Sequence, residues 1–195
     1  RSYMAKGLLT DYKDSFEDLD QIGMVRFVAS TAVETVLERT NARSILERLR
    51  GIAGVAQLLR APRYPDSIVL GDAGRTSLAA LSKPLNVDEL IELAVQLARA
   101  MTGMHHRGVM HRDIAPANIV LSQYRAPCLV DFALATLLAE VRPEFTHHTR
   151  ILGTLAYLAP EQTGRTGRTV NQRADLYAFG ATLYELAAGQ PPFGS

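Results

Sequence analysis

The sequence predicts an α+β fold in two lobes, a small β-rich lobe followed by a larger, mostly helical one. Residues 1–70 mix a strand-like run with helical periodicity, residues 71–76 form a glycine-containing connector, and residues 77–195 carry two long helical patterns separated by short strands. With 195 residues that are 47% hydrophobic, the chain is long enough to bury a sizeable core. We therefore expect one domain over 1–195, with its hinge at 71–76.

The first lobe has few strong elements. Residues 24–28 are strand-like, and an interrupted apolar stripe predicts a helix over 31–50. Residues 68–70 form a short apolar run that predicts a second strand. The glycines of residues 71–74 end that strand, so the lobe boundary is placed there.

The second lobe is predicted to begin with a long helix. Asn86 followed by Glu89 is a capping signal, and apolar residues then keep helical spacing up to Gly108. Residues 119–121 and 128–130 read as the two strands of a hairpin whose polar turn contains Pro127.

Helical spacing then predicts a buried central helix near the end of the chain. The apolar residues that recur at this spacing are Leu176, Phe179, Leu183 and Leu186. Gly189 and the prolines after it end the helix.

The segment from His111 to Asn118 reads HRDIAPAN, and Asp131 follows the predicted hairpin. Since Asn118 and Asp131 lie at the two outer ends of that hairpin, the fold brings them close together. Phosphoryl transfer needs such a set: one carboxylate, here Asp113, for the proton of the acceptor hydroxyl, and an Asp and an Asn for magnesium.

Composition excludes several other classes. A net charge of +1 gives no long-range attraction to nucleic acid. Cys128 is the only cysteine, which excludes an internal disulfide and favours a reducing, cytoplasmic setting. No apolar run reaches the ~18 residues of a membrane helix. The chain begins with Arg1, so we expect it to be part of a longer polypeptide.

These motifs resemble a protein kinase domain of the Ser/Thr type. Besides HRDIAPAN, the chain carries DFA at residues 131–133 and GTLAYLAPE at 153–161, which resembles the end of an activation segment. The run GTLAYLAPEQTGR is similar to the N-terminal kinase-like domain of large signalling proteins with ATPase and sensor histidine kinase modules. The resemblance implies a bilobal protein-kinase-like fold cut after its central helix, ATP and Mg²⁺ as cofactors, and protein substrates or regulatory partner domains.

The resemblance also implies roles for individual residues. Asp113 would be the catalytic base, Asn118 a magnesium ligand, and Asp131 the ligand that links magnesium to the ATP phosphates. Thr154 would meet Asp113, which favours Ser or Thr acceptors over tyrosine. Asp175 would accept hydrogen bonds from the backbone of the catalytic loop, or act as an ordinary helix N-cap.

The connector is implied to hold the adenine. The backbone of Gly71 and Ala73 would supply hydrogen bonds, and Leu70 would lie behind the pocket. Arg112 would bind a phosphate on Thr146 or Thr149, with pairing to a local carboxylate as the alternative.

Several positions depart from the kinase pattern. Ala115 replaces a lysine that neutralises the transferring phosphoryl group, and Ala133 replaces a glycine. A lysine for the nucleotide phosphates, its glutamate partner and a glycine-rich loop are not evident, with Ala42 at the glutamate position.

Three functions therefore compete. The first is an active Ser/Thr kinase, and the second is a pseudokinase that regulates a larger signalling protein. The third is a small-molecule phosphotransferase, which residues 153–161 argue against. A metal site at the paired histidines His105 and His106 is disfavoured, because such residues are more often solvated.

Overall fold

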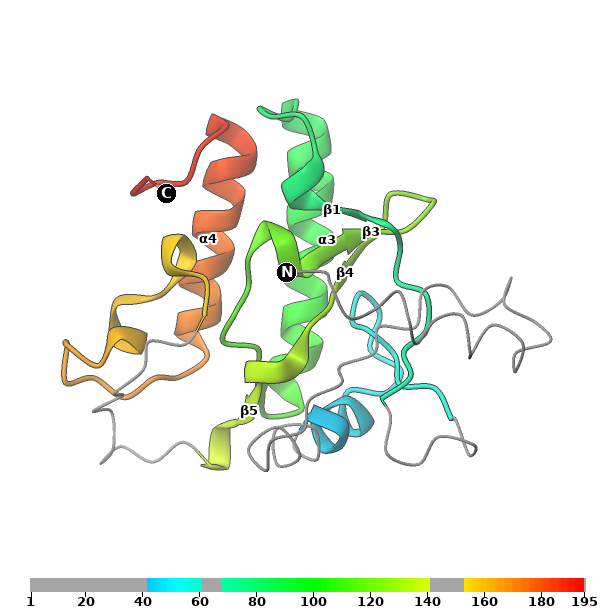
Figure 1. The fold of residues 1–195 in the computed structure, drawn as a ribbon, viewed down its shortest axis with the longest axis vertical. Coiled ribbons are helices and arrows are strands. Elements are labelled where there is room, and N and C mark those ends of the chain that lie inside the picture. The colour runs from blue at the N-terminus through cyan, green and yellow to red at the C-terminus, as the bar shows by residue number, and fades with distance from the viewer. Residues whose placement is uncertain (1–41, 61–67, 141–152, 195) are drawn as a thin grey trace, which may run out of the picture.

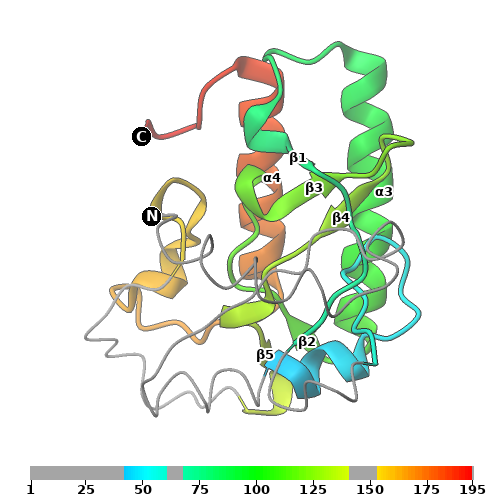
Figure 2. The same ribbon diagram turned by 45° about the vertical axis from the view of Figure 1, so that its right-hand side comes forward.

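The described structure is built around two neighbouring helices. It is a computed structural model that describes residues 42–60, 68–140 and 153–194. The helices α3 (Val87–His106) and α4 (Arg173–Ala188) lie side by side, and a small sheet lies across α3 (Figures 1 and 2). This arrangement confirms the predicted α+β class.

Helix α3 begins where the sequence indicates. The Asn86 side chain accepts a hydrogen bond from the Glu89 backbone N–H at 2.9 Å, which satisfies one of the free donors of the first turn. The helix runs for 20 residues. It ends before Gly108, whose φ of +71° suits a residue without a side chain.

Two small antiparallel sheets flank residues 111–118, the predicted catalytic loop. One has the order β1-β3-β4 and is formed by β1 (Thr76–Ser77), β3 (Ile119–Leu121) and β4 (Pro127–Leu129). The other pairs β2 (Val109–Met110) with β5 (Thr136–Leu137). The chain between β2 and β3 is thereby held at both of its ends.

Short 3₁₀ helices fill the connections. They are η1 (Leu78–Ala80), η2 (Pro116–Asn118), η3 (Phe132–Leu134), η4 (Leu138–Glu140), η6 (Leu155–Tyr157) and η7 (Pro160–Thr163). Residues 42–48 form a helix that packs on the same interior.

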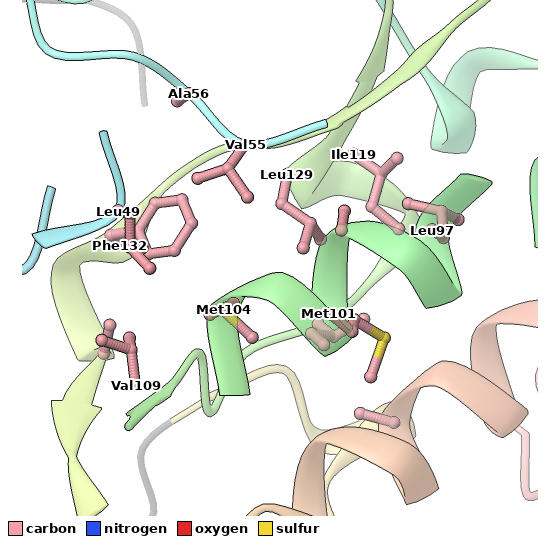
Figure 3. Packing of buried hydrophobic residues seen from close by; sticks show 14 of the residues in the cluster. Leu49, Val55, Ala56, Leu97, Met101, Met104, Val109, Ile119, Leu129 and Phe132 are labelled. Atoms are coloured by element: carbon pink, nitrogen blue, oxygen red, sulfur yellow. The ribbon is translucent and has the colours of Figure 1, made fainter. Parts of the chain in front are cut away.

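The core lies between α3, the β3–β4 hairpin and residues 45–58 (Figure 3). Met104 of α3 is 0% exposed, as are Ile119 of β3 and Leu49. Burying each such side chain contributes about 1.5–3 kcal/mol. The hairpin that carries the site residues is therefore fixed on the longest helix of the described chain.

Two strand predictions need correction. Residues 68–70 form no strand, and only an isolated antiparallel bridge joins Leu58 to Leu70. The second hairpin strand is Pro127–Leu129, one residue earlier than predicted, so Pro127 lies in the strand and not in the turn. Its lack of an N–H is tolerated at the end of a strand at the sheet edge, because β4 is the outer strand of the order β1-β3-β4.

The burial predicted for α4 is also partly wrong. Leu186 is 0% exposed, but Leu176 is 52% exposed. The buried face consists mainly of small and polar residues: Ala174, Asp175, Ala178, Ala181, Thr182, Glu185 and Leu186. The predicted end is confirmed, since Gly189 follows the helix with a φ of +83°.

Predictions for residues 24–28 and for 31–41 lie outside the described residues. Neither α3 nor α4, the two long helices of the described ranges, combines the length and hydropathy that a bilayer-spanning helix requires.

Candidate active site

The catalytic loop after β2 is held from behind by Asp175. Its Oδ2 accepts from the His111 N–H at 2.9 Å, and its Oδ1 accepts from the Arg112 N–H at 2.8 Å. The predicted contact with the loop backbone is thus confirmed. The alternative reading as an N-cap is wrong, because Gln172 holds that position and Asp175 lies inside the first turn.

Arg112 takes a left-handed backbone conformation, with a φ of +67°. Such a conformation costs about 1–3 kcal/mol in a residue with a side chain, so the surroundings must hold it. Asp175 binds the N–H of Arg112, and the Gln162 Nε2 donates to the Arg112 carbonyl at 2.9 Å. Both peptide groups of the strained residue are therefore tied to the C-terminal part of the chain.

The side chain of Arg112 is partly buried. Burial lowers the pKa of its guanidinium, and the charge of Asp175 opposes that shift. Among the described residues, its buried Nε has no hydrogen-bond partner. The candidate phosphosites Thr146 and Thr149 lie outside the described residues, so the predicted phosphate clamp stays a prediction.

The carboxylate of Asp113 is oriented from two sides. Its Oδ1 accepts from both the backbone N–H and the side-chain hydroxyl of Thr154, each at 2.8 Å. Its Oδ2 accepts from the Asn118 Nδ2 at 2.8 Å, and the same nitrogen donates to the Asp113 carbonyl at 2.9 Å. The structure thus brings together the three residues predicted to be catalytic.

Asn118 and Asp131 lie at one end of the β3–β4 hairpin, as the sequence predicts. The Val130 N–H donates to the Asn118 carbonyl at 2.9 Å, which places the following Asp131 beside Asn118. Asp131 has a φ of +63°. The Nδ2 atom of Asn118 faces Asp113. The amide oxygen of Asn118 is therefore the atom that could face a cation.

His111 joins the two loops from the inside. Its Nε2 lies 3.1 Å from the Val130 carbonyl, and the Asp113 N–H donates to its Nδ1 at 3.4 Å. This pairing favours the tautomer that carries its proton on Nε2. Phe132 is 4% exposed and lies in the core, where the centroid of its ring is 4.6 Å from that of His111.

The two substituted positions behave differently. Ala115 is 0% exposed, so it presents no side chain to a substrate. Ala133 is exposed in η3, and the left-handed residue of that turn is Asp131. Ala133 itself has no positive φ, so its side chain causes no backbone strain there.

The connector passes close to the hairpin. The Gly71 N–H donates to the Gln57 carbonyl at 2.9 Å, while Leu70 and Ala73 are partly buried. Gly74 has a φ of +123°, and a Cβ placed there would lie 2.0 Å from the Leu121 carbonyl oxygen. Only glycine allows this approach. No contact in the described structure tests the adenine-binding roles, which stay predictions.

Some residues at the site were missed by sequence reasoning. His105 is not solvated: its Nε2 lies 2.9 Å from the Asp175 Oδ2, and the two groups pair. Glu185 of α4 is 7% exposed and is bound by both Lys83 and Tyr157. The sequence signal for His105 and Glu185 was a titratable residue within a helix that is otherwise largely apolar. Such a signal does not show which residue it contacts. Within the described ranges, no cluster of three or more His, Cys, Asp or Glu residues could hold a metal ion.

In this site Asp113 is hydrogen-bonded to Thr154, and Asn118 lies beside Asp131. Such an arrangement is typical of phosphotransferases of the kinase type. A family model described as a protein kinase domain matches residues 31–195. The chain belongs to this family. The family generally uses ATP and a divalent metal and acts on protein substrates.

The relatives place the chain among kinases of the Ser/Thr type. It is 36% identical over 130 residues to the serine/threonine-protein kinase PknB of Mycolicibacterium smegmatis, covering 67% of this chain and 20% of that protein. It is 44% identical over 96 residues to the DNA damage-responsive serine/threonine-protein kinase RqkA of Deinococcus radiodurans, covering 49% of this chain and 14% of that protein. These matches favour a Ser/Thr kinase domain over the pseudokinase alternative.

The fold is supported by a solved structure. The kinase PK-1 of the Cydia pomonella granulovirus has a TM-score of 0.66 at 16% identity, over 78% of this chain and 56% of that one. At this identity the likeness shows the fold alone, and it confirms the protein-kinase-like prediction. The chain spans about a fifth of the length of PknB. The predicted place in a larger signalling protein and the division at 71–76 stay predictions.

Proposed function

We propose that this domain transfers the γ-phosphoryl group of ATP to serine or threonine hydroxyls of proteins. The observation that carries the proposal is the geometry of Asp113. Its two carboxylate oxygens are fixed at 2.8 Å by Asn118 on one side and by Thr154 on the other. A general base needs such fixed orientation toward the proton that it receives.

The carboxylate of Asp113 can accept one more hydrogen bond, which an acceptor hydroxyl could donate. Each carboxylate oxygen can accept about two hydrogen bonds. Oδ1 of Asp113 already accepts two from Thr154, whereas Oδ2 accepts one from Asn118. The acceptor hydroxyl would therefore donate to Oδ2, and Asp113 would take up its proton there. The hydroxyl oxygen would bond to the γ-phosphorus as the bond from that phosphorus to the departing ADP breaks.

Asn118 and Asp131 would hold Mg²⁺, since an amide oxygen and a carboxylate at one end of a hairpin form the hard oxygen set that this ion prefers. When bound, MgATP supplies the phosphoryl group and the divalent charge that offsets the phosphates. For the nucleotide, we propose the backbone of Gly71 and Ala73 as hydrogen-bonding groups for the adenine, with Leu70 behind it.

The acceptor would enter beside Asp113. Thr154, Tyr157 and Leu158 lie beside Asp113 around a gap that has no room for a water molecule. An acceptor peptide that reaches Asp113 would therefore lie against the segment from Thr154 to Leu158. The hydroxyl of Thr154 already lies within hydrogen-bond distance of Asp113. The hydroxyl of a Ser or Thr acceptor has the same size and would fit beside it.

The test compares wild type with Asp113→Asn in the whole natural protein, using labelled ATP and a protein acceptor. The amide cannot take a proton, so transfer is expected to fall by about 10²–10⁴-fold. Asp88→Asn removes an exposed carboxylate from the first turn of α3 and serves as the matched control. Equal transfer by Asp113→Asn and wild type would contradict the proposal. A thermal shift with MgATP would then distinguish a nucleotide-binding pseudokinase from a domain that binds none.

A further inference from the structure

A buried acid on α4 lies next to the segment that faces the acceptor. Glu185 is 7% exposed, and both of its carboxylate oxygens are bound. Oε1 pairs with the Lys83 ammonium, and Oε2 accepts from the Tyr157 hydroxyl. A buried carboxylate is stable only when it is paired and hydrogen-bonded, so each of these two partners matters to Glu185.

Lys83 reaches Glu185 because the loop before α3 is tied to α4. The Leu85 N–H donates to the Leu186 carbonyl at 2.8 Å. This bond brings the loop against the turn of α4 that carries Glu185. The side chain of Lys83 is 12% exposed, so its charge is largely removed from water.

Tyr157 connects this pair to the proposed catalytic base. It is the last residue of η6, and its N–H donates to the Thr154 carbonyl at 2.9 Å. Thr154 in turn binds Asp113 through its own N–H and hydroxyl. Burial and the charge of Glu185 raise the pKa of the Tyr157 hydroxyl, so it remains a donor over the working pH range.

We propose that Lys83, through Glu185 and Tyr157, is a positioning residue that holds the acceptor-facing segment 154–158 in register with Asp113. Lys83 pairs with the buried Glu185, Glu185 accepts a hydrogen bond from the hydroxyl of Tyr157, and Tyr157 fixes η6. Lys83 itself touches no reacting atom. The inference rests on the proposed function for its kinetic effect, but the ordering of 154–158 is a property of the chain alone.

The first variant for the test is Tyr157→Phe, which removes one hydroxyl and leaves the Lys83–Glu185 pair in place. The expected result is a loss of about tenfold in kcat/KM for a protein acceptor, the rate equivalent of one hydrogen bond to a charged group. The KM for ATP is expected to stay unchanged, because the proposed nucleotide-binding residues, 70–73, Asn118 and Asp131, lie outside the segment 154–158. Tyr184→Phe is the matched control, because Tyr184 lies on α4 but is 49% exposed.

The role of the positive charge of Lys83 is tested by substitutions that remove it or keep it. Lys83→Met leaves Glu185 without its cation and is expected to lower the acceptor kcat/KM to a similar degree, whereas Lys83→Arg keeps it. Adding Glu185→Gln to Lys83→Met is expected to restore most of the rate. The neutral amide needs no cation and still accepts from Tyr157.

Amide hydrogen exchange provides a readout that needs no activity. The amides of Thr154 and Tyr157 are expected to exchange about tenfold faster in Tyr157→Phe and Lys83→Met. If wild type transfers no phosphate, the proposed function fails while this readout still tests the positioning role. If the amides of Thr154 and Tyr157 exchange in Tyr157→Phe at the wild-type rate, the inference is overturned.

Discussion

Replacing Asp175 with asparagine is expected to destabilise the domain far more than the same change at an exposed position. Asp175 is 1% exposed. Its two oxygens accept the N–H groups of His111 and Arg112, at 2.9 and 2.8 Å. Asparagine has the same shape but only one accepting oxygen, so one of these two buried N–H groups loses its acceptor and faces another donor.

The size of the effect follows from that count. A buried donor left without a partner costs about 1–3 kcal/mol, and a hydrogen bond to a charged group contributes about 1.5–3 kcal/mol. We therefore expect Asp175→Asn to lower the free energy of unfolding by about 2–3 kcal/mol, and Asp175→Ala by about twice as much. Either value is a large part of the total stability of a domain, which is about 5–15 kcal/mol.

Urea unfolding followed by circular dichroism measures this difference as a shift of the midpoint at constant slope. Asp88→Asn is the control, since Asp88 is an exposed acid in the first turn of α3 and its loss costs about 1 kcal/mol or less. Equal midpoints for Asp175→Asn and Asp88→Asn would refute the reasoning, because the loop backbone would then not depend on this carboxylate.

Two further predictions concern Gly74 and Cys128. Gly74→Ala is expected to cost about 3 kcal/mol or more, because its Cβ would lie 2.0 Å from a backbone oxygen. Gly180→Ala meets nothing within 4 Å on α4 and is expected to stabilise by about 0.5–1 kcal/mol; similar melting temperatures for the two variants would contradict the clash. Burial raises the pKa of the Cys128 thiol from 9.0 to about 11. Alkylation at pH 8 is therefore expected to be about 100-fold slower in the folded than in the unfolded protein, by mass spectrometry. The folded state favours the neutral thiol of Cys128. Its contribution to the free energy of unfolding is therefore complete below pH 9 and is lost as the pH rises toward 11. Alkylation at equal rates in both states would exclude the burial.

The elements with local signals were predictable from the sequence. Helix α3 has a capping pair at Asn86 and Glu89 and a long apolar period, and both of its ends were found. The hairpin was found too, but its second strand was shifted by one residue. Strand ends depend on which backbone groups find a partner across the sheet, and a short apolar run does not specify that choice.

The contacts that complete the site could not be predicted in this way. Lys83 and Glu185 are 102 positions apart, and no periodic pattern links them. His105 was expected to be solvated, yet it pairs with Asp175. Such pairs are set by how α3 and α4 pack together. Asp113 and Asn118 could be proposed because they are five positions apart and their chemistry is specific. Thr154 is 41 positions from Asp113 and was proposed only from the resemblance to kinases.

Helix α4 explains why apolar periodicity misassigned its faces. Hydrophobic spacing assumes that a buried face is apolar, but the buried face of α4 carries two carboxylates, Asp175 and Glu185, between small residues. Alanines at 174, 178 and 181 have little side chain to bury, so the catalytic loop and η6 can approach the helix closely. Asp175 fixes the loop before Asp113, and Glu185 fixes the segment after Thr154. The proposed base, Asp113, therefore lies between two segments that are held by buried carboxyl groups of a single helix, and a rotation of α4 would disturb both segments at once.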